Sequence, residues 1–383
     1  MLVTLFWIAL LLGLYPYVIY PVLVSALGRL SGRSVRASES FTPTVTVITA
    51  AFNEARHIEA TVRNKLAQDY PPDQLEMLIV SDGSDDGTDE VVRRLVEEDF
   101  RVRLIRQIPR QGKTAALNCA VAAARGEILV FADANSMYRT DTVRRLASNF
   151  ADPSVGYVTG NMLYVDREGS LVGDGCSAYM RYENHLRAAE TRVGSIVGVD
   201  GGVDAVRRRL YVPMTPDQLP DFVLPLAVVE QGYRVVYDSR AVLTEDTLAT
   251  YASEYRMRVR VSLRAFWSLW QKRQLLNPLR FGVFSWQLLS HKLLRYLSFL
   301  PLALAVLISG LLWGEGLLYQ LIVLGECAFA LLILGAVRAP QTIGAWAPAR
   351  YGYYFFLLNW AAAVAFSRFL RGERQVLWTP RVG

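Results

Sequence analysis

Two oxygen-bearing side chains stand at the end of an apolar stretch, where they could bind a metal ion. Asp133 and Asn135 close the segment Phe131-Ala-Asp133-Ala-Asn135, directly after the apolar residues that begin at Ile128. Carboxylate and amide oxygens suit hard cations such as Mg²⁺, which take their other ligands from phosphates and water. A cation there would neutralise charge on a departing diphosphate. Asp133 and Asn135 are therefore candidate metal ligands; the alternative is an aspartate that only caps the next helix.

A third carboxylate has the surroundings of a general base. Asp221 lies in Leu219-Pro220-Asp221-Phe222, among apolar residues at an expected helix start. Desolvation raises a carboxyl pKa toward that of a working base. The alternative for Asp221 is a helix N-cap without chemistry.

Two polar turns could contact a phosphorylated ligand. The segment Thr49-Ala50-Ala-Phe-Asn53-Glu54 follows an apolar strand, so its backbone N–H groups precede a helix and are available to a ligand. Asn53 could equally be an ordinary helix cap. The acidic turn that begins Ser81-Asp82-Gly83 could accept from a base or from ribose hydroxyls, or could simply be solvated. It is not a calcium loop, because Ser and Arg occupy the third and twelfth positions counted from Asp82.

A lysine stands at another expected helix start. Gly112-Lys113 precedes a helical stretch that carries Asn118, but the fourth residue before Gly112 is Ile108 and the first glycine of a Walker loop is absent. A cation at a helix N-terminus opposes the helix dipole. Lys113 therefore indicates an anion at this point.

These residues fall at the junctions of an alternating pattern of strands and helices. Apolar strands are expected at 45–49, 77–81 and 128–133, and helices at 55–68, 89–98 and 114–124. Strands without polar alternation are typical of a parallel sheet that helices cover on both faces. Ligands of such sheets bind at the carboxyl ends of the strands, which is where the polar residues stand.

Composition limits the class of protein. The chain has 383 residues, of which 52% are hydrophobic and 20% charged, and its net charge is +6. These values exclude a disordered chain and one that lies mostly in a membrane. Cys119, Cys176 and Cys327 are too few and too far apart for a disulfide scaffold or a CxxC metal site. A reducing, cytosolic environment is expected for the polar part.

The N-terminus predicts a membrane anchor. Leu2–Leu27 contains 26 residues without a charge, more than the ~20 that span a bilayer as a helix. A cleaved signal peptide, the alternative, would have basic residues before the apolar stretch. Arg29, Arg33 and Arg36 follow it instead, which places the next domain in the cytoplasm.

Three apolar stretches near the C-terminus also predict membrane helices. They are 296–313, 316–337 and 351–366, and the short WGEG link predicts a hairpin of the first two. Residues 255–292, rich in Arg, Lys, Trp and Phe, are expected at the membrane interface; a basic helix on the soluble domain is the alternative. If all three stretches span, the basic tail lies outside against the positive-inside rule, so the topology stays open. That tail contains Arg368, Arg371, Arg374 and Arg381.

The predicted organisation has four parts. Residues 1–28 form an N-terminal transmembrane anchor and 29–254 a cytosolic domain, while 255–292 form an interfacial amphipathic segment and 293–383 a C-terminal transmembrane region with a basic tail.

Together, in this order, the motifs resemble those of membrane-bound family 2 glycosyltransferases, the cellulose and hyaluronan synthase-like group. The resemblance extends from about residue 42 to 247. It implies an α/β, type A nucleotide-sugar-binding domain, with a mixed, mostly parallel sheet flanked by helices, followed by transmembrane helices.

The resemblance also implies roles for individual residues. Ala50, Asn53 and Glu54 match the turn that contacts the nucleotide, Asp82 the acid that reads the base, and Lys113 the lysine near the diphosphate. Asp133 and Asn135 stand where the family has its DxD metal motif, with Asn in place of the second Asp. Asp221 matches the general base, with Asp246 as runner-up. The QxxRW motif of processive synthases is missing, although Arg256 and Arg260 could hold the diphosphate.

The expected activity is that of a metal-dependent, inverting hexosyl- or N-acetylhexosaminyltransferase. It would use Mg²⁺ or Mn²⁺ and a nucleotide-diphosphate sugar, a UDP-sugar first, and would transfer to a hydroxyl of a lipid-linked or polysaccharide acceptor. The resemblance implies a multi-pass protein of the inner (plasma) membrane with a cytoplasmic catalytic domain and no nucleic-acid partner. Two alternatives are a processive polysaccharide synthase and an inactive scaffold subunit. Retention of Asp82, Asp133 and Asp221 argues against the scaffold.

Overall fold

The computed structural model describes the chain except residues 166–170, 247–250, 341, 345 and 376–383. Arg381 and part of the predicted cytosolic domain's end lie outside the described residues. The centre of the molecule is an eight-stranded sheet in the order β3-β2-β1-β4-β7-β6-β8-β5. The strands are β1 Val45–Ala51, β2 Leu75–Asp82, β3 Val102–Gln107, β4 Ile128–Phe131, β5 Met137–Tyr138, β6 Val155–Val165, β7 Asp204–Arg207 and β8 Arg234–Asp246.

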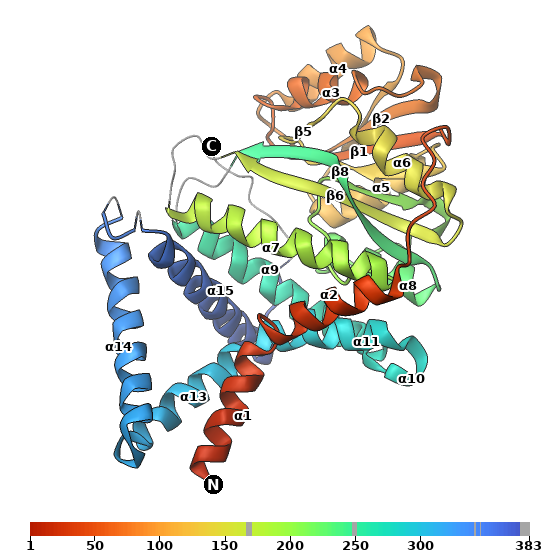
Figure 1. Cartoon of the computed structure of the whole chain (residues 1–383). Coiled ribbons are helices and arrows are strands. Elements are labelled where there is room, and N and C mark those ends of the chain that lie inside the picture. Colours follow the sequence, from red (N-terminus) through yellow and green to blue (C-terminus); the bar gives the residue numbers. More distant parts are fainter. Residues whose placement is uncertain (166–170, 247–250, 341, 345, 376–383) are drawn as a thin grey trace.

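Helices cover both faces of the sheet and continue beyond it (Figure 1). Those before the last strand are α1 Leu2–Leu14, α2 Ile19–Ser31, α3 Ile58–Leu66, α4 Thr88–Glu98, α5 Lys113–Ala123, α6 Thr142–Ser148, α7 Leu171–Val193 and α8 Pro220–Glu230. Those after it are α9 Tyr251–Gln271, α10 Pro278–Phe281, α11 Val283–Gln287, a π-helix at Leu288–Leu293, α12 Leu294–Leu297, α13 Phe299–Leu311, α14 Leu317–Arg338 and α15 Ala347–Leu370.

The first half of the sheet is parallel, as the apolar strands predict. β2 and β4 both pair parallel to β1, and β3 pairs parallel to β2. Side chains of β1 alternate between two apolar cores: Val47 packs with α3 and α4 on one face, and Ile48 packs with α5 on the other. Both faces are therefore buried, which is why these strands show no polar alternation.

The second half of the sheet is mixed. β7 lies antiparallel between β4 and β6, β8 returns parallel to β6, and β5 is antiparallel to β8. The mixed, mostly parallel sheet of the type A fold is confirmed. The expected helix at 55–68 begins later, at Ile58, because the residues after β1 form bends and a turn instead of a first helical turn.

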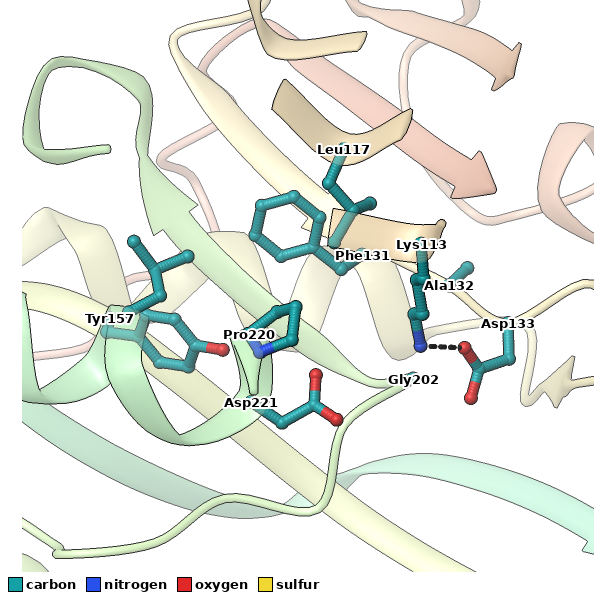
Figure 2. Close-up of a pocket in the computed structure, with 10 residues that line it drawn as sticks. Lys113, Leu117, Phe131, Ala132, Asp133, Tyr157, Gly202, Pro220 and Asp221 are labelled. Carbon is teal, nitrogen blue, oxygen red and sulfur yellow. Dashed lines mark hydrogen bonds and ion pairs between the residues drawn. The ribbon is translucent and has the colours of Figure 1, made fainter. Parts of the chain in front are cut away.

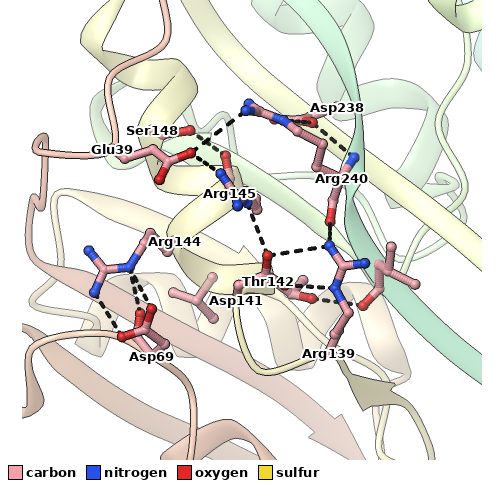
Figure 3. A network of polar contacts seen from close by, with 12 residues as sticks. Glu39, Asp69, Arg139, Asp141, Thr142, Arg144, Arg145, Ser148, Asp238 and Arg240 are labelled. Atoms are coloured by element: carbon pink, nitrogen blue, oxygen red, sulfur yellow. Dashed lines mark hydrogen bonds and ion pairs between the residues drawn. The ribbon is translucent and has the colours of Figure 1, made fainter.

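A charged network fastens the linker that enters the domain (Figure 3). Arg145 on α6 contacts Glu39 of the linker and Asp141 on its own helix, the latter at 3.0 Å. Arg240 on β8 lies 3.8 Å from the same Glu39 carboxylate. Exposed pairs contribute little singly, but here two arginines from different elements converge on one linker residue. The network thus fixes where the chain from α2 reaches the sheet.

The N-terminal apolar stretch is not the single straight helix expected from Leu2–Leu27. It is a pair, α1 and α2, bent by 53° at a break that contains Pro16, and α2 continues to Ser31 beyond the predicted anchor. Proline removes a helical hydrogen-bond donor and clashes with the preceding turn, which explains the break. α2 packs on α7 of the sheet domain through Tyr20 and Val24 with Leu186.

The late apolar stretches differ in length and packing. Among the described residues, α14 and α15 are long and apolar enough to cross a membrane, and each of two bent pairs, α1–α2 and Val283–Leu297 with α13, could form one more span. The WGEG link does connect α13 to α14, but the helices diverge from it, and α13 packs against α1 (Figure 1). Tyr319 of α14 joins the same cluster as Ala305 and Ile308 of α13, and the hairpin through a membrane stays a prediction.

Helix α9, in the predicted interfacial segment, lies between the sheet domain and α15. Ala265 and Leu269 pack with Phe222 of α8, whereas Leu263 packs with Ala361 of α15. The helix therefore connects the sheet domain to the C-terminal helices. Its position at a membrane interface stays a prediction.

Candidate active site

The first two polar turns hold each other through side chain–backbone hydrogen bonds. Asn53 has a positive φ of 55°, a conformation that Asn tolerates better than most residues. Its side chain donates to Asp85 at 2.8 Å and accepts from the Asp85 backbone N–H at 3.0 Å. The backbone N–H of Glu54 donates to Thr88 at 2.9 Å. These bonds fix Asn53 outside the main cavity and leave Ala50 and Glu54 on its wall.

Asp82 at the end of β2 is fully buried and already engaged by its own chain. Its Oδ1 accepts from Gln107 at 2.6 Å and from the Gln111 backbone N–H at 2.8 Å, and its Oδ2 accepts from the Gly112 backbone N–H at 2.8 Å. In the same loop the Arg110 guanidinium lies 3.5 Å from the centre of the Phe52 ring. Asp82 therefore shapes the loop that leads to α5, and base recognition by Asp82 stays a prediction.

The loop with Asp133 and Asn135 is supported from beneath by α3. Thr61 donates to the Ala134 carbonyl at 2.6 Å, and the fully buried Lys65 donates to the Ser136 carbonyl. Burial lowers the pKa of Lys65 to about 7, although Asp133 opposes this shift. These contacts keep residues 133–136 out of a regular helix and turn their side chains toward the cavity.

Lys113, the first residue of α5, is paired with a carboxylate of the chain itself, and its contact with a diphosphate stays a prediction. Its Nζ donates to Asp133 Oδ1 at 2.6 Å (Figure 2). Burial lowers the Lys113 pKa, but the negative charges of Asp133, Asp221 and Glu245 outweigh it and raise the pKa overall. Lys113 is therefore a fixed cation between Asp133 and Asp221.

Asp221 points into the same space from the first turn of α8 (Figure 2). It is the second helical residue, and no side chain caps this helix, so the N-cap alternative does not describe it. Burial raises the Asp221 pKa and Asp133 adds to the rise, whereas Lys113, Arg264 and Arg260 lower it. Asp246, the runner-up base, is the last residue of β8.

Two adjacent glycines pass between the carboxylates, and the motif analysis missed them. Gly201 and Gly202 have φ of 75° and 76°. A Cβ on Gly201 would lie 2.6 Å from Asp221 Oδ2, and one on Gly202 would lie 3.1 Å from Asp133 Oδ2. Only glycine combines that backbone conformation with so close an approach. The pair Gly-Gly after Asp200 was the available signal.

A cavity of about 290 Å³ joins these residues, close to the lower end of the ~300–1,000 Å³ typical of ligand pockets. Among the predicted residues, its wall contains Ala50, Glu54, Lys113, Asp133, Asn135, Asp221 and Arg260. Asn53 and Asp82 lie behind the wall, and Arg256 is exposed on α9. The wall also contains charged residues that sequence reasoning did not single out: Glu183, Arg187, Asp200, Arg264 and Lys292.

The donor set fits a hard divalent cation that shares its ligands with substrate. Asp133 and Asn135 offer oxygens, and Asn135 Nδ2 lies 3.3 Å from Glu245 Oε1. Among the described residues no group of three or more His, Cys, Asp or Glu side chains is arranged for a metal ion. Mg²⁺ and Mn²⁺ would therefore take further ligands from a diphosphate and water. A bound ion there would compensate diphosphate charge, with Lys113 beside it.

A mixed sheet with an Asp-x-Asn loop, a buried acid and a cationic wall defines a nucleotide-sugar-binding domain of the type A fold. Residues 46–207 match the family model "Glycosyl transferase family 2". The sheet domain therefore resembles the family 2 glycosyltransferases over these residues.

One solved structure shares this fold, and curated proteins are similar in sequence. The mannosyltransferase PcManGT from Pyrobaculum calidifontis, solved with GDP-Man and Mn²⁺, has a TM-score of 0.73 and 24% identity, and the match covers 96% of this chain and 99% of that one. The glycosyltransferase AglD of Haloferax volcanii is 36% identical over 137 residues, 34% of this chain and 22% of AglD. The poly-β-1,6-N-acetyl-D-glucosamine synthase of Staphylococcus aureus is 26% identical over 236 residues, 58% of this chain and 57% of the synthase. The chain thus spans only part of both curated relatives.

Proposed function

We propose that this chain is a membrane-anchored, inverting glycosyltransferase that moves a sugar from a nucleotide-diphosphate donor to an acceptor hydroxyl. The observation that carries the proposal is one cavity with two carboxylates in different settings. Asp133 is paired with Lys113, while Asp221 has a pKa raised by burial. Two carboxyl groups whose surroundings shift their pKa values in different ways can take different roles in acid–base catalysis.

The donor end of the cavity lies at Lys113, Asp133 and Asn135. The diphosphate would bind here with Mg²⁺ or Mn²⁺, and Lys113 would stabilise charge on the leaving group. Ala50 and Glu54 line the cavity, which supports a nucleotide site at the turn that follows β1. PcManGT was solved with GDP-Man, and the staphylococcal relative is named for a polymer of N-acetylglucosamine. A test should therefore include both GDP- and UDP-sugars.

Asp221 is the proposed base. A carboxylate with a raised pKa takes the proton of the acceptor hydroxyl while that oxygen attacks the anomeric carbon. Attack from the face opposite the diphosphate inverts the configuration. Holding both substrates in one cavity supplies the positional part of the rate acceleration.

Membrane anchoring is proposed from the helices outside the sheet. Along α14, apolar side chains such as Leu321 and Leu331 are 56% and 67% exposed. Such a continuous apolar surface on a helix of bilayer length is stable in hydrocarbon rather than in water. The catalytic cavity would then lie at the cytoplasmic face of the inner membrane.

The proposal is tested by release of nucleotide from the purified full chain in nanodiscs. A panel of UDP- and GDP-sugars with Mn²⁺ or Mg²⁺ is offered with membrane lipid extract as acceptor, and the linkage of the product is analysed by NMR. We expect metal-dependent turnover of one donor and a product of inverted anomeric configuration. Retained configuration would contradict Asp221 as a base, and a full panel without donor binding would contradict the function.

A processive synthase is the second candidate, because one curated relative is a polysaccharide synthase. The length of the product in the same assay separates the two. Single addition is the result expected here, and a ladder of long polymer would favour the synthase.

A further inference from the structure

The stretch of chain that leads into α8 has no regular structure of its own. Residues 211–219, which we call the entry segment, form neither a helix nor a strand. Asp221 follows as the second residue of α8, and no side chain caps that helix. Backbone polar groups outside helices and strands need partners from elsewhere in the protein. The position of the proposed base therefore depends on what holds the entry segment.

Helix α5 holds the first half of the entry segment through Asn118. Its Nδ2 donates to the Met214 carbonyl at 2.7 Å, and its Oδ1 accepts from the Met214 backbone N–H at 3.1 Å. The same Oδ1 accepts from the Tyr211 hydroxyl at 2.7 Å. Lys113 is the first residue of this helix. The entry segment and Lys113 are therefore supported by one element.

Helix α9 holds the second half of the entry segment through Arg264. Arg264 Nε donates to the Asp217 carbonyl at 3.2 Å. Its Nη2 donates to the Pro216 carbonyl at 3.2 Å and also to the Gln218 carbonyl. At the end of α9, Gln271 Oε1 accepts from Gln218 Nε2 at 2.7 Å. One guanidinium thus holds three consecutive carbonyls just before α8 begins.

The same guanidinium reaches the first turn of α5. Arg264 Nη2 donates to Thr114 Oγ1 at 3.2 Å, and Thr114 Oγ1 donates to the Gln218 carbonyl at 3.2 Å. Thr114 is buried and follows Lys113 directly in the chain. Arg264 therefore joins the starts of two helices, the one that carries Lys113 and the one that carries Asp221.

The partners of Arg264 indicate a positional role. The residue is only 7% exposed, and burying a charge is costly unless it is paired or hydrogen-bonded. In the part of the chain that the structure describes, its hydrogen bonds go to backbone carbonyls and to Thr114, and none goes to a carboxylate. Burial lowers the Arg264 pKa to about 10, and the Asp221 carboxylate opposes this shift most strongly. Arg264 thus fixes backbone and faces the proposed base with its charge.

The space between the two helix starts is narrow (Figure 2). Lys113, Asp133 and Asp221 line a small space of about 10 Å³, close to the ~10–15 Å³ that one water molecule needs. A shift of α8 against α5 would change the distance between Asp221 and Lys113. A misplacement of 1 Å costs about 10²-fold in rate, so a tie between these helices has a catalytic consequence.

We propose that Arg264 is a positioning residue, whose guanidinium fastens the entry segment to the first turn of α5 and so fixes Asp221 relative to Lys113. The catalytic consequence rests on the proposed function, whereas the fastening itself does not. Arg264 lines the cavity, but its donors are directed to the protein's own backbone. It therefore acts on the reaction through Asp221.

The charge of Arg264 supplies a second, separable effect. Burial raises the Asp221 pKa, and Arg264 is among the cations that lower it. The charged and titratable groups that face Asp221 from the elements around it are Lys113 of α5, Asp133 after β4, Tyr157 of β6, Asp204 of β7, and Arg260 and Arg264 of α9. Removing the Arg264 charge should raise the Asp221 pKa, whereas a change that keeps the charge should not.

The test compares Arg264→Gln with Arg264→Lys in the full chain in nanodiscs. Both variants lose the guanidinium that spans three carbonyls, but lysine keeps the positive charge. We expect kcat of nucleotide release to fall at least tenfold in both, with donor affinity in the presence of Mn²⁺ unchanged. The acid limb of kcat/KM should move to higher pH in Arg264→Gln only.

Arg207 of β7 supplies the matched control. It is also 7% exposed and also donates to three backbone carbonyls, but it does not line the cavity. Those carbonyls belong to Phe150, Asp152 and Val155. Arg207→Lys should lower the melting temperature and leave both kcat and the acid limb unchanged. If the Arg264 variants fold poorly, Gln271→Met removes only the second contact of α9 and should lower kcat by less.

Hydrogen exchange of backbone amides measures the fastening without any substrate. In Arg264→Lys, amides of the entry segment and of the first turn of α8 should exchange faster than in the native chain. In Arg207→Lys, the faster exchange should lie around residues 150–155 instead. Unchanged exchange of the entry segment in Arg264→Lys would overturn the fastening.

The kinetic results can also contradict the proposal. Native kcat in Arg264→Lys, with faster exchange of the entry segment, would overturn the positioning role. A loss of donor affinity as large as the loss of kcat would make Arg264 a substrate ligand and would overturn it as well. A native chain that binds no donor, with the exchange pattern as expected, would contradict the proposed function and support the fastening.

Discussion

The two sides of the catalytic cavity are built in different ways. On the donor side, short turns are held by hydrogen bonds to backbone groups, as where Asp82 binds the Gln111 and Gly112 N–H groups. On the opposite side, formed by α7, α9 and the C-terminal helices and proposed to take the acceptor, charged side chains from distant parts of the chain meet. Lys292 and Glu183, for example, are separated by more than a hundred residues along the chain. The donor side therefore depends on local motifs, while the acceptor side depends on how α7, α9 and the C-terminal helices pack.

The largest effect is expected from Asp221→Asn, because Asp221 is the proposed base between the donor and acceptor sides of the cavity. Loss of the base should lower kcat about 10²–10⁴-fold without loss of donor binding. Asp217→Asn, the same change off the cavity, is the control and should remain active. Near-normal turnover in Asp221→Asn would transfer the role to Asp246.

The pH profile of the native enzyme sharpens that test. Since burial raises the Asp221 pKa, activity should rise with pH through a value above that of an ordinary aspartate. Lys113 lowers this pKa, so Lys113→Gln should move the acid limb of kcat/KM to higher pH. An unchanged acid limb in this variant would contradict the electrostatic link between the two residues.

The glycine pair offers a matched comparison of the two sides. Gly201→Ala should displace the Asp221 carboxylate and lower turnover, whereas Gly202→Ala should displace Asp133 and weaken Mn²⁺ binding. A misplacement of 1 Å costs about 10²-fold in rate. Gly232→Ala shares the backbone strain, with φ of 85°, but its Cβ would meet nothing within 4 Å. The comparison fails if all three variants lose the same function.

Asn135→Asp should strengthen the donor side. The second carboxylate of the DxD motif returns, so Mn²⁺ should bind about tenfold more tightly, as one added ligand charge suggests. Without metal the new carboxylate would repel Glu245, whose Oε1 lies 3.3 Å from Asn135 Nδ2, and should lower the melting temperature. Metal titrations followed by thermal unfolding measure both effects, and an unchanged metal affinity would contradict Asn135 as a ligand.

The smallest effect concerns Lys65 beneath the metal loop. Burial lowers the pKa of Lys65 from its ordinary value of 10.5 to about 7, so the unfolded chain binds more protons between these two pH values. Stability contributed by Lys65 should therefore rise as the pH increases from 7 toward 10. Lys65→Met should remove this slope from the melting temperature, and a slope identical to that of the native protein would show that Lys65 is charged when folded.

The difference between the two sides also explains what the sequence could predict. The strands at 45–49, 77–81 and 128–133 follow from local patterns, and the structure agrees with them. The 53° break has a local cause in Pro16, which a count of apolar residues does not take into account. The packing of α13 against α1, by contrast, depends on contacts between distant helices.

The same reasoning applies to individual site residues. Arg256 and Arg260 looked equivalent by sequence, but only Arg260 lines the cavity, whereas Arg256, one helical turn earlier on α9, is exposed. Gly201 and Gly202 are visible in the sequence as two adjacent glycines after an aspartate. Their role could not be predicted, because it depends on the carboxylates that the fold brings close to them.

The most direct test of the central claim separates binding from turnover in one preparation. Donor affinity with and without Mn²⁺, and nucleotide release, are measured for the native chain, Asp133→Ala and Asp221→Asn. The account predicts that Asp133→Ala loses metal-dependent donor binding, whereas Asp221→Asn binds donor normally but does not turn it over. Normal turnover in either variant, or loss of donor binding in Asp221→Asn alone, would contradict the division of roles between the two carboxylates.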